Sequence, residues 1–237
     1  MADLPIPFTP IMMQANLAGR KSQTRRPMAQ PSIDAIGCRP VPAEGRNTRW
    51  EYFDASGRSE SVKLKYAIGD RLYAREAWRT YISLDGVAPR DLLTEERGAG
   101  IAYIAGGGIS ITKPPLVYGY DADRDDLAAF GKFRQGMHLP RWGSRATCVV
   151  TAVKVERLND ISEDDAIAEG VTPHPAGGFW VPGVEHPDPN FPWLSRPTAR
   201  EMYAALWDTI HGSGAWSANP FVPVYSYSFI PKNIDDI

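Results

Sequence analysis

The stretch from residue 146 to residue 156 restricts the possible folds more than any other part of the chain. It reads Ala-Thr-Cys-Val-Val-Thr-Ala-Val-Lys-Val-Glu and is rich in β-branched residues, which pack well in strands. We therefore predict a core strand here. A second strand is predicted over residues 221–230, where aromatic residues alternate on one face in a pattern that suits the closing strand of a barrel.

Two short helices are predicted between these strands. Ser162 is a typical N-cap residue, acidic residues fill the positive first turn after it, and Gly170 ends that helix. Thr198 and Glu201 form a Thr-x-x-Glu capping box for the second helix, which is predicted to run to Ile210. Strands and helices together predict an α/β (α+β) fold.

The length and composition allow one domain with a sizeable core. The chain has 237 residues, of which 43% are hydrophobic, and we expect a single domain spanning residues 1–237. Two long, loop-rich insertions are predicted within it, at about residues 28–65 and 80–140, because prolines and glycines interrupt both segments. The first insertion reads as a long loop that could hold one hairpin.

The cysteines, histidines and apolar runs point away from several classes of protein. Cys38 and Cys148 make no disulfide framework, so a reducing cytoplasm is the expected location. No apolar run approaches the about 20 residues that a membrane helix needs, and no signal peptide opens the chain. The four histidines show no metal-ligand spacing, so neither a metal nor another cofactor is expected.

The run from Gly19 to Arg26 is the strongest candidate for a functional site. Four cations and two hydroxyls occupy its eight residues, directly after a helix predicted to begin at Thr9 and to stop at Gly19. Residues 1–79 hold 13 Lys and Arg against 8 Asp and Glu, whereas the remainder holds 13 against 20. Polyanion or nucleotide binding is therefore expected in the N-terminal third. The alternative is a group of solvated cations beside the negative end of the helix dipole.

Alternation along a strand that leaves Gly19 assigns a face to each side chain of this run. Ser22, Thr24 and Arg26 share one face, the two residues between them share the other, and Lys21 at the turn can reach either. A lysine beside a threonine hydroxyl can act as base and nucleophile, because neighbouring arginines lower the pKa of a lysine. The sequence therefore suggests a pair formed by Lys21 and Thr24.

The same residues resemble a known family. The pattern Gly19-x-Lys21-x-x-x-x-Arg26 is similar to the Gly-x-Lys-x-x-x-x-Arg signature of the ASCH domain. Residues 18–26 also resemble, almost position for position, the Ala-Gly-Arg-Lys-Thr-x-Thr-x-Arg segment of small bacterial ASCH proteins that are N(4)-acetylcytidine amidohydrolases. Residues 140–145 and 216–220 are similar to runs found in larger phage and prophage ASCH-type proteins.

The resemblance implies a fold, a location and a reaction. The fold would be a PUA-like β-barrel flanked by short helices, in the cytoplasm of a bacterial host cell if a phage encodes it. The reaction would be metal-free hydrolysis of an acylated or otherwise modified nucleoside or nucleobase. Lys21 would accept a proton, Thr24 would be the nucleophile, and Glu169, the match in register, would donate a proton to the leaving amine. Arg26 or backbone amides after Gly19 could hold the oxyanion.

Six residues are predicted to bind the substrate: Ser22, Arg25, Arg26, Tyr73, Arg75 and Trp142. Trp142 lies between two arginines and could stack on a base with phosphate contacts beside it. Tyr73 and Arg75 share one face of a predicted strand and could line the same cavity. Packing in the core is the equal alternative for all three.

Two other functions fit the same basic run. One is a non-catalytic module that binds RNA or DNA, in which Lys21, Arg25 and Arg26 contact phosphates. The other is a ribonuclease that uses the same basic pocket. The expected partner is a modified nucleoside or a nucleic acid. For the nucleic acid, the family resemblance favours RNA over DNA.

Overall fold

The structure is a computed structural model that describes residues 1–237 except 43, 95–98, 107, 112–115, 119–129 and 192. The chain divides into two compact units. Unit 1 comprises Met1–Ala2, Ala18–Arg71 and Val149–Phe229, and unit 2 comprises Asp3–Leu17, Leu72–Cys148 and Ile230–Ile237. Both units contain strands and helix, which confirms a mixed α/β class.

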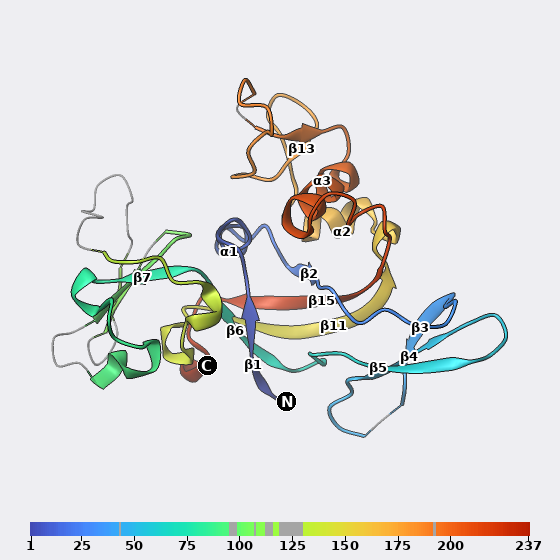
Figure 1. Ribbon diagram of the computed structural model, residues 1–237, viewed down its shortest axis with the longest axis horizontal. Helices are drawn as coiled ribbons and strands as arrows, with labels where there is room; N and C mark the ends of the chain where they lie inside the picture. The colour runs from blue at the N-terminus through green and yellow to red at the C-terminus, as the bar shows by residue number, and fades with distance from the viewer. Residues whose placement is uncertain (43, 95–98, 107, 112–115, 119–129, 192) are drawn as a thin grey trace. The chain divides into compact units, whose positions relative to one another are not determined.

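Unit 1 carries two of the three described α-helices and three groups of strands (Figure 1). Its elements are β2 (Gln23–Arg25), β3 (Gly37–Pro40), β4 (Arg49–Phe53), β5 (Ser59–Lys63), most of β11 (Thr147–Arg157), α2 (Glu163–Ala168), β12 (Thr172–Pro173), β13 (Phe179–Trp180), β14 (Ser195–Arg196), α3 (Ala199–His211) and most of β15 (Phe221–Ile230). The order of its main strands is β11-β15-β2. Two smaller antiparallel sheets have the orders β3-β4-β5 and β12-β13-β14.

Unit 2 contains the remaining helix and two groups of strands. Its elements are β1 (Asp3–Pro7), α1 (Pro10–Leu17), most of β6 (Arg71–Arg75), β7 (Trp78–Thr80), β8 (Ala99–Tyr103), β9 (Gly108–Ile111) and β10 (Leu116–Tyr118). β1 lies beside β6, and an antiparallel sheet has the order β10-β9-β8-β7. Short 3-10 turns cover Ile82–Leu84, Pro89–Thr94, Gly136–His138, Arg141–Gly143 and Ile234–Asp236, and one in unit 1 covers Leu158–Asp160.

The predicted strands and helix caps are confirmed. The strand predicted over residues 146–156 is β11, and the strand predicted over residues 221–230 is β15. Ser162 Oγ accepts a hydrogen bond from the amide of Asp165 and so caps α2. Thr198 Oγ1 accepts from the amide of Glu201, whose carboxylate accepts in turn from the amide of Thr198. This capping box begins α3.

The first predicted insertion is more regular than expected. Instead of a long loop with room for one hairpin, this segment contributes β3, β4 and β5, which form a three-stranded sheet. Trp50 and Tyr52 alternate along β4 and are buried, which gives this strand a core-facing side. Asp54 then shapes the turn into β5, because its carboxylate accepts hydrogen bonds from the amides of Ser56 and Arg58.

The second predicted insertion, at 80–140, lies partly outside the described residues. Its described part contributes to a hydrophobic cluster of unit 2, made up of Trp78, Leu84, Leu92, Ile101, Tyr103 and Leu139. Trp142 packs against this cluster and is half-buried. In unit 1, Phe221 at the start of β15 packs against Tyr52, with ring centroids 5.2 Å apart. Among the helices that the structure describes, none is long and apolar enough to cross a membrane.

Candidate active site

The main chain brings the basic run to the end of α2. Gly19 has a φ of +68°, a left-handed conformation that favours glycine, and the chain then enters β2. The amide of Ser22 donates to the carbonyl of Ala168 at 2.9 Å, and the carbonyl of Ser22 accepts from the amide of Tyr227 at 2.9 Å. Since Lys21 precedes Ser22 and Glu169 follows Ala168, these bonds place the two residues side by side.

Lys21 and Glu169 form a buried ion pair. The ammonium nitrogen of Lys21 lies 2.5 Å from Oε2 of Glu169 and also donates to the carbonyl oxygen of Glu169 at 2.9 Å. Only 1% of the Lys21 side chain and 3% of the Glu169 side chain are exposed. Burial lowers the pKa of Lys21; the Glu169 charge opposes this shift but does not cancel it, and Arg26 and Arg25 add to the lowering. The arrangement therefore eases loss of the lysine proton.

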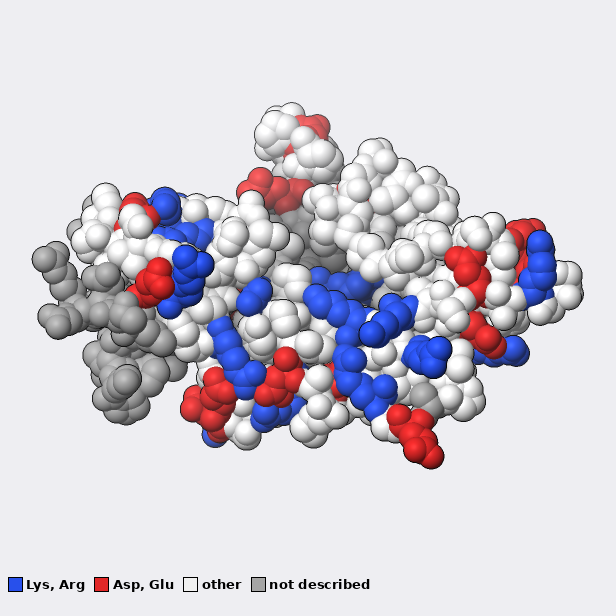
Figure 2. Space-filling view, turned by 60° about the horizontal axis from the view of Figure 1, so that its bottom comes forward, with Lys and Arg blue, Asp and Glu red and all other residues white. Residues whose placement is uncertain are grey.

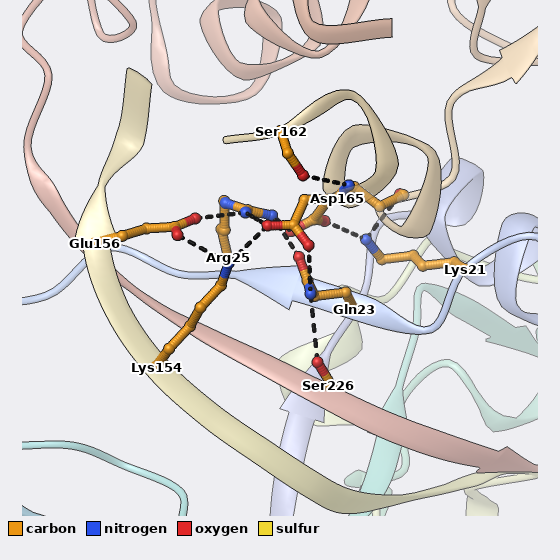
Figure 3. Close-up of polar contacts among 9 residues, drawn as sticks. Lys21, Gln23, Arg25, Lys154, Glu156, Ser162, Asp165 and Ser226 are labelled. Atoms are coloured by element: carbon orange, nitrogen blue, oxygen red, sulfur yellow. Dashed lines mark hydrogen bonds and ion pairs between the residues drawn. The ribbon is translucent and has the colours of Figure 1, made fainter. Parts of the chain in front are cut away.

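Arg25 occupies the other side of Glu169. Its Nη1 donates to Oε1 of Glu169 at 3.2 Å and to Oε1 of Gln23 at 2.7 Å. Its Nη2 donates to Oε1 of Glu156 at 2.6 Å and to Oδ2 of Asp165 at 3.0 Å. The Arg25 side chain has no exposed surface. One guanidinium thus joins β2 to β11, to α2 and to the residue that ends α2 (Figure 3).

Lys154 lies at the outer, half-exposed edge of this network. Its ammonium group lies 2.7 Å from Oδ2 of Asp165 and 2.9 Å from Oε2 of Glu156. Gln23 Nε2 contacts Oδ1 of Asp165 at 3.2 Å and Oγ of Ser226 at 3.3 Å (Figure 3). Three cations therefore face three carboxylates, so the charges of the cluster balance, as buried charges require.

Tyr203 on α3 completes the surroundings of Glu169. Its side chain hydrogen-bonds to Glu169, and its ring lies 5.8 Å from the guanidinium carbon of Arg25. Burial raises the pKa of Tyr203 well above its ordinary value, and the Glu169 charge adds to the shift. The phenol is therefore a hydrogen-bond donor at neutral pH. α3 is held against α2 because the carboxylate of Glu163 accepts from the amides of Ala199 and Arg200.

The side chains of Thr24 and Ser22 in the basic run are not part of this network. Thr24 is buried and pairs with Tyr225 of β15, on the face of β2 opposite to Arg25. Among the described residues, the Thr24 hydroxyl has no hydrogen-bond partner, so the structure does not join it to Lys21 or to Glu169. The Ser22 side chain is exposed. Arg26 is half-buried, and its charge acts on Lys21.

Three predicted substrate contacts belong to unit 2. Arg75 Nη2 donates to the hydroxyl of Tyr73 at 3.2 Å, and its Nη1 donates to the carbonyl of Met137 at 3.0 Å. Tyr73 and Arg75 do share a face, as predicted. Trp142 packs against the hydrophobic cluster of that unit.

The comparisons with known proteins do not assign this chain to a family. No family model, no curated protein and no solved structure matches this chain. The resemblance to ASCH proteins therefore stays a prediction that rests on the motif residues. Within the described part of the chain, no three His, Cys, Asp or Glu side chains are grouped so that they could hold a metal ion.

Sequence reasoning missed several members of the network. No sequence pattern points to Glu156, Tyr203 or Gln23, and Asp165 stands out only as one of the acidic residues that follow Ser162. One local signal was available for Asp165: it precedes Glu169 by four residues, which places both carboxylates on one side of α2. The contacts of Glu156 and Tyr203 have no such signal.

Proposed function

We propose that unit 1 is a hydrolase of the N(4)-acetylcytidine amidohydrolase kind, with the PUA-like barrel of an ASCH domain as its fold. The observation that carries the proposal is the buried contact of 2.5 Å between Lys21 and Glu169. The motif resemblance pairs these same two residues as proton acceptor and proton donor, although they stand 148 residues apart in the chain. A buried base beside a buried acid is what hydrolysis of an amide requires.

The pair can exchange one proton. With the proton on Glu169, Lys21 is a neutral amine, which is the form that can act as a base. Lys21 then accepts the proton of Thr24 as Thr24 Oγ1 bonds to the acyl carbon. Glu169 gives its proton to the exocyclic nitrogen as the carbon–nitrogen bond breaks. In the second half, water attacks the acyl-threonine, its proton passes to Glu169, and Lys21 returns its proton to Thr24.

The burial of the cations bears on the competing proposal, a module that binds phosphates through Lys21, Arg25 and Arg26. The side chains of Lys21 and Arg25 are 1% and 0% exposed and are paired with carboxylates. Lys21 and Arg25 therefore do not contribute to the basic surface that Figure 2 shows. This arrangement supports proton transfer more than contact with a polyanion.

The test is release of cytidine from N(4)-acetylcytidine, followed by chromatography. We expect Thr24→Val, Lys21→Met and Glu169→Gln to lower the rate by about 100-fold or more. Ser61→Ala is the matched control, because it removes an exposed hydroxyl of β5 in unit 1, away from the site. Absence of turnover in the unaltered protein would overturn the proposal, above all if oligonucleotides bind with a salt dependence that weakens in Arg26→Ala.

The nucleophile is tested separately. An acyl group on Thr24 adds a defined mass to the peptide that contains it, and rapid acid quenching followed by mass spectrometry detects this peptide. Turnover without an acylated Thr24, together with an active Thr24→Val protein, would assign the attack to water instead.

A further inference from the structure

Arg25 and Lys21 each contact one oxygen of the Glu169 carboxylate. Nη1 of Arg25 donates to Oε1 at 3.2 Å, whereas Oε2 accepts from the ammonium group of Lys21 at 2.5 Å. Because the two oxygens are fixed by donors on opposite sides, the carboxylate plane cannot turn away from Lys21 without breaking a contact with Arg25. The orientation of the acid is thus set by a residue outside the proton-transfer pair.

Arg25 itself is anchored by groups other than Glu169. Its Nη2 contacts Glu156 at 2.6 Å and Asp165 at 3.0 Å, and its Nη1 also contacts the side-chain oxygen of Gln23 at 2.7 Å. A guanidinium is planar and presents its donors in a rigid fork, which a lysine cannot reproduce. Four acceptors on two sides of this fork leave Arg25 little freedom to move.

We propose that Arg25 is a positioning residue for the proton transfer: it holds Oε1 of Glu169 so that Oε2 stays directed at Lys21. The catalytic meaning of this inference rests on the proposed function, whereas the orientation of Glu169 toward Lys21 does not. Substitution of Arg25 is expected to disturb the chemical step and to leave substrate binding nearly unchanged.

The experiment compares Arg25→Gln, which removes the charge, with Arg25→Lys, which keeps the charge and loses the fork. Arg39→Gln is the matched control, since Arg39 is a cation of unit 1 whose side chain is 61% exposed. Two quantities are measured for each protein. One is kcat and KM for N(4)-acetylcytidine, and the other is the titration midpoint of Lys21, followed by NMR of ¹³C-labelled lysine without substrate.

Both Arg25 variants are expected to lose about 100-fold in kcat, as a misplaced catalytic group does, with KM within about twofold. The Lys21 midpoint is expected to fall by about one pH unit in Arg25→Lys, because the charge at position 25 is kept while a Glu169 carboxylate that turns away no longer stabilises the charged lysine. The Arg39→Gln protein should match the unaltered protein in each respect. An Arg25→Lys protein that equals the unaltered one would overturn the positioning role, because charge alone would then suffice.

A variant that changes no charge keeps the test usable if the Arg25 variants do not fold. Gln23→Leu removes one anchor of Nη1 and changes no charge, so an effect on Lys21 has to pass through Arg25 or its neighbours. We expect kcat about tenfold lower and a smaller downward shift of the Lys21 midpoint. A folded Gln23→Leu protein with unchanged kcat and midpoint would count against the proposal.

The two proposals fail in different ways. If the unaltered protein releases no cytidine, the proposed function is wrong. The NMR titration needs no substrate and still decides whether Arg25 orients Glu169 toward Lys21. An unchanged Lys21 midpoint in folded Arg25→Lys overturns the inference even if the protein is an active hydrolase.

Discussion

The ammonium group of Lys21 and the carboxylate of Glu169 meet at 2.5 Å in the interior of unit 1, and both side chains are almost wholly buried. Such a pair has two separate consequences. Removal of one partner leaves the other charge without its counterpart in a low-dielectric environment, which affects stability. Transfer of one proton within the pair changes what each group can do chemically, which affects activity.

The stability consequence is tested with Lys21→Met. We expect the free energy of unfolding to fall by about 3 kcal/mol, because a buried carboxylate loses one of its two cationic partners. Urea unfolding followed by circular dichroism measures the change. Arg39→Ala is the control: it breaks an exposed pair with Glu51 and should cost at most about 1 kcal/mol. Equal losses in the two variants would show that water reaches the Lys21 pair in solution.

The activity consequence is a pH dependence. The active form of the pair holds one proton, on Glu169, and the pair loses this proton above the pKa of Lys21, so kcat/KM should fall as the pH rises through that pKa. Since burial lowers that pKa, and Arg26 and Arg25 lower it further, the fall should come at a lower pH than for an ordinary lysine. Initial rates across a pH series give the inflection. A flat profile would exclude Lys21 as the base.

Tyr203→Phe separates the phenol from the ring. The variant loses the hydrogen bond to Glu169 and keeps the aromatic face near Arg25. We expect kcat to fall about tenfold, the equivalent of one hydrogen bond to a charged group. Tyr52→Phe is the control, because it removes a hydrogen bond from a buried tyrosine to the carbonyl of Ala29, outside the site. A Tyr203→Phe protein as active as Tyr52→Phe would show that the phenol serves packing alone.

The parts of the fold that could be predicted depend on contacts between near neighbours in the chain. Ser162 caps α2 through an amide three residues away, and Thr198 with Glu201 forms the box that begins α3. The β-branched run of β11 is likewise a local property. The β3-β4-β5 sheet was underestimated, because prolines around it obscured the alternation of Trp50 and Tyr52.

The network around Glu169 could be predicted only in part. The motif resemblance paired Lys21 with Glu169, yet nothing local links residues 148 positions apart. Alternation correctly separated Thr24 from Arg25, but it could not show that Arg25 turns toward three carboxylates instead of toward solvent. Those acids come from β11, from α2 and from its C-terminal end, and only the folded sheet brings them to β2.

Asp70 offers a last test, away from the site. Its carboxylate is fully buried and accepts from the amides of Ala2 and Ala67 and from Arg46. Burial alone would raise the pKa of Asp70, but the bonds from Arg46 and the two amides outweigh it and lower the pKa. The folded state therefore binds the Asp70 proton less readily than the unfolded state, so the stabilisation is complete above about pH 4 and disappears as pH falls further.

Asp70→Asn should accordingly lower the free energy of unfolding by about 3 kcal/mol at pH 7, since one amide oxygen replaces two charged acceptors. The difference from the unaltered protein should shrink as the pH falls below about 4, because Asp70 binds its proton there in the unfolded chain before it does so in the folded protein. Urea unfolding at pH 7, 5 and 3 measures it. Asp34→Asn is the control at an exposed position and should change stability little at any of these values. A difference for Asp70→Asn that stays constant from pH 7 to pH 3 would show that shape, and not charge, explains the role of Asp70.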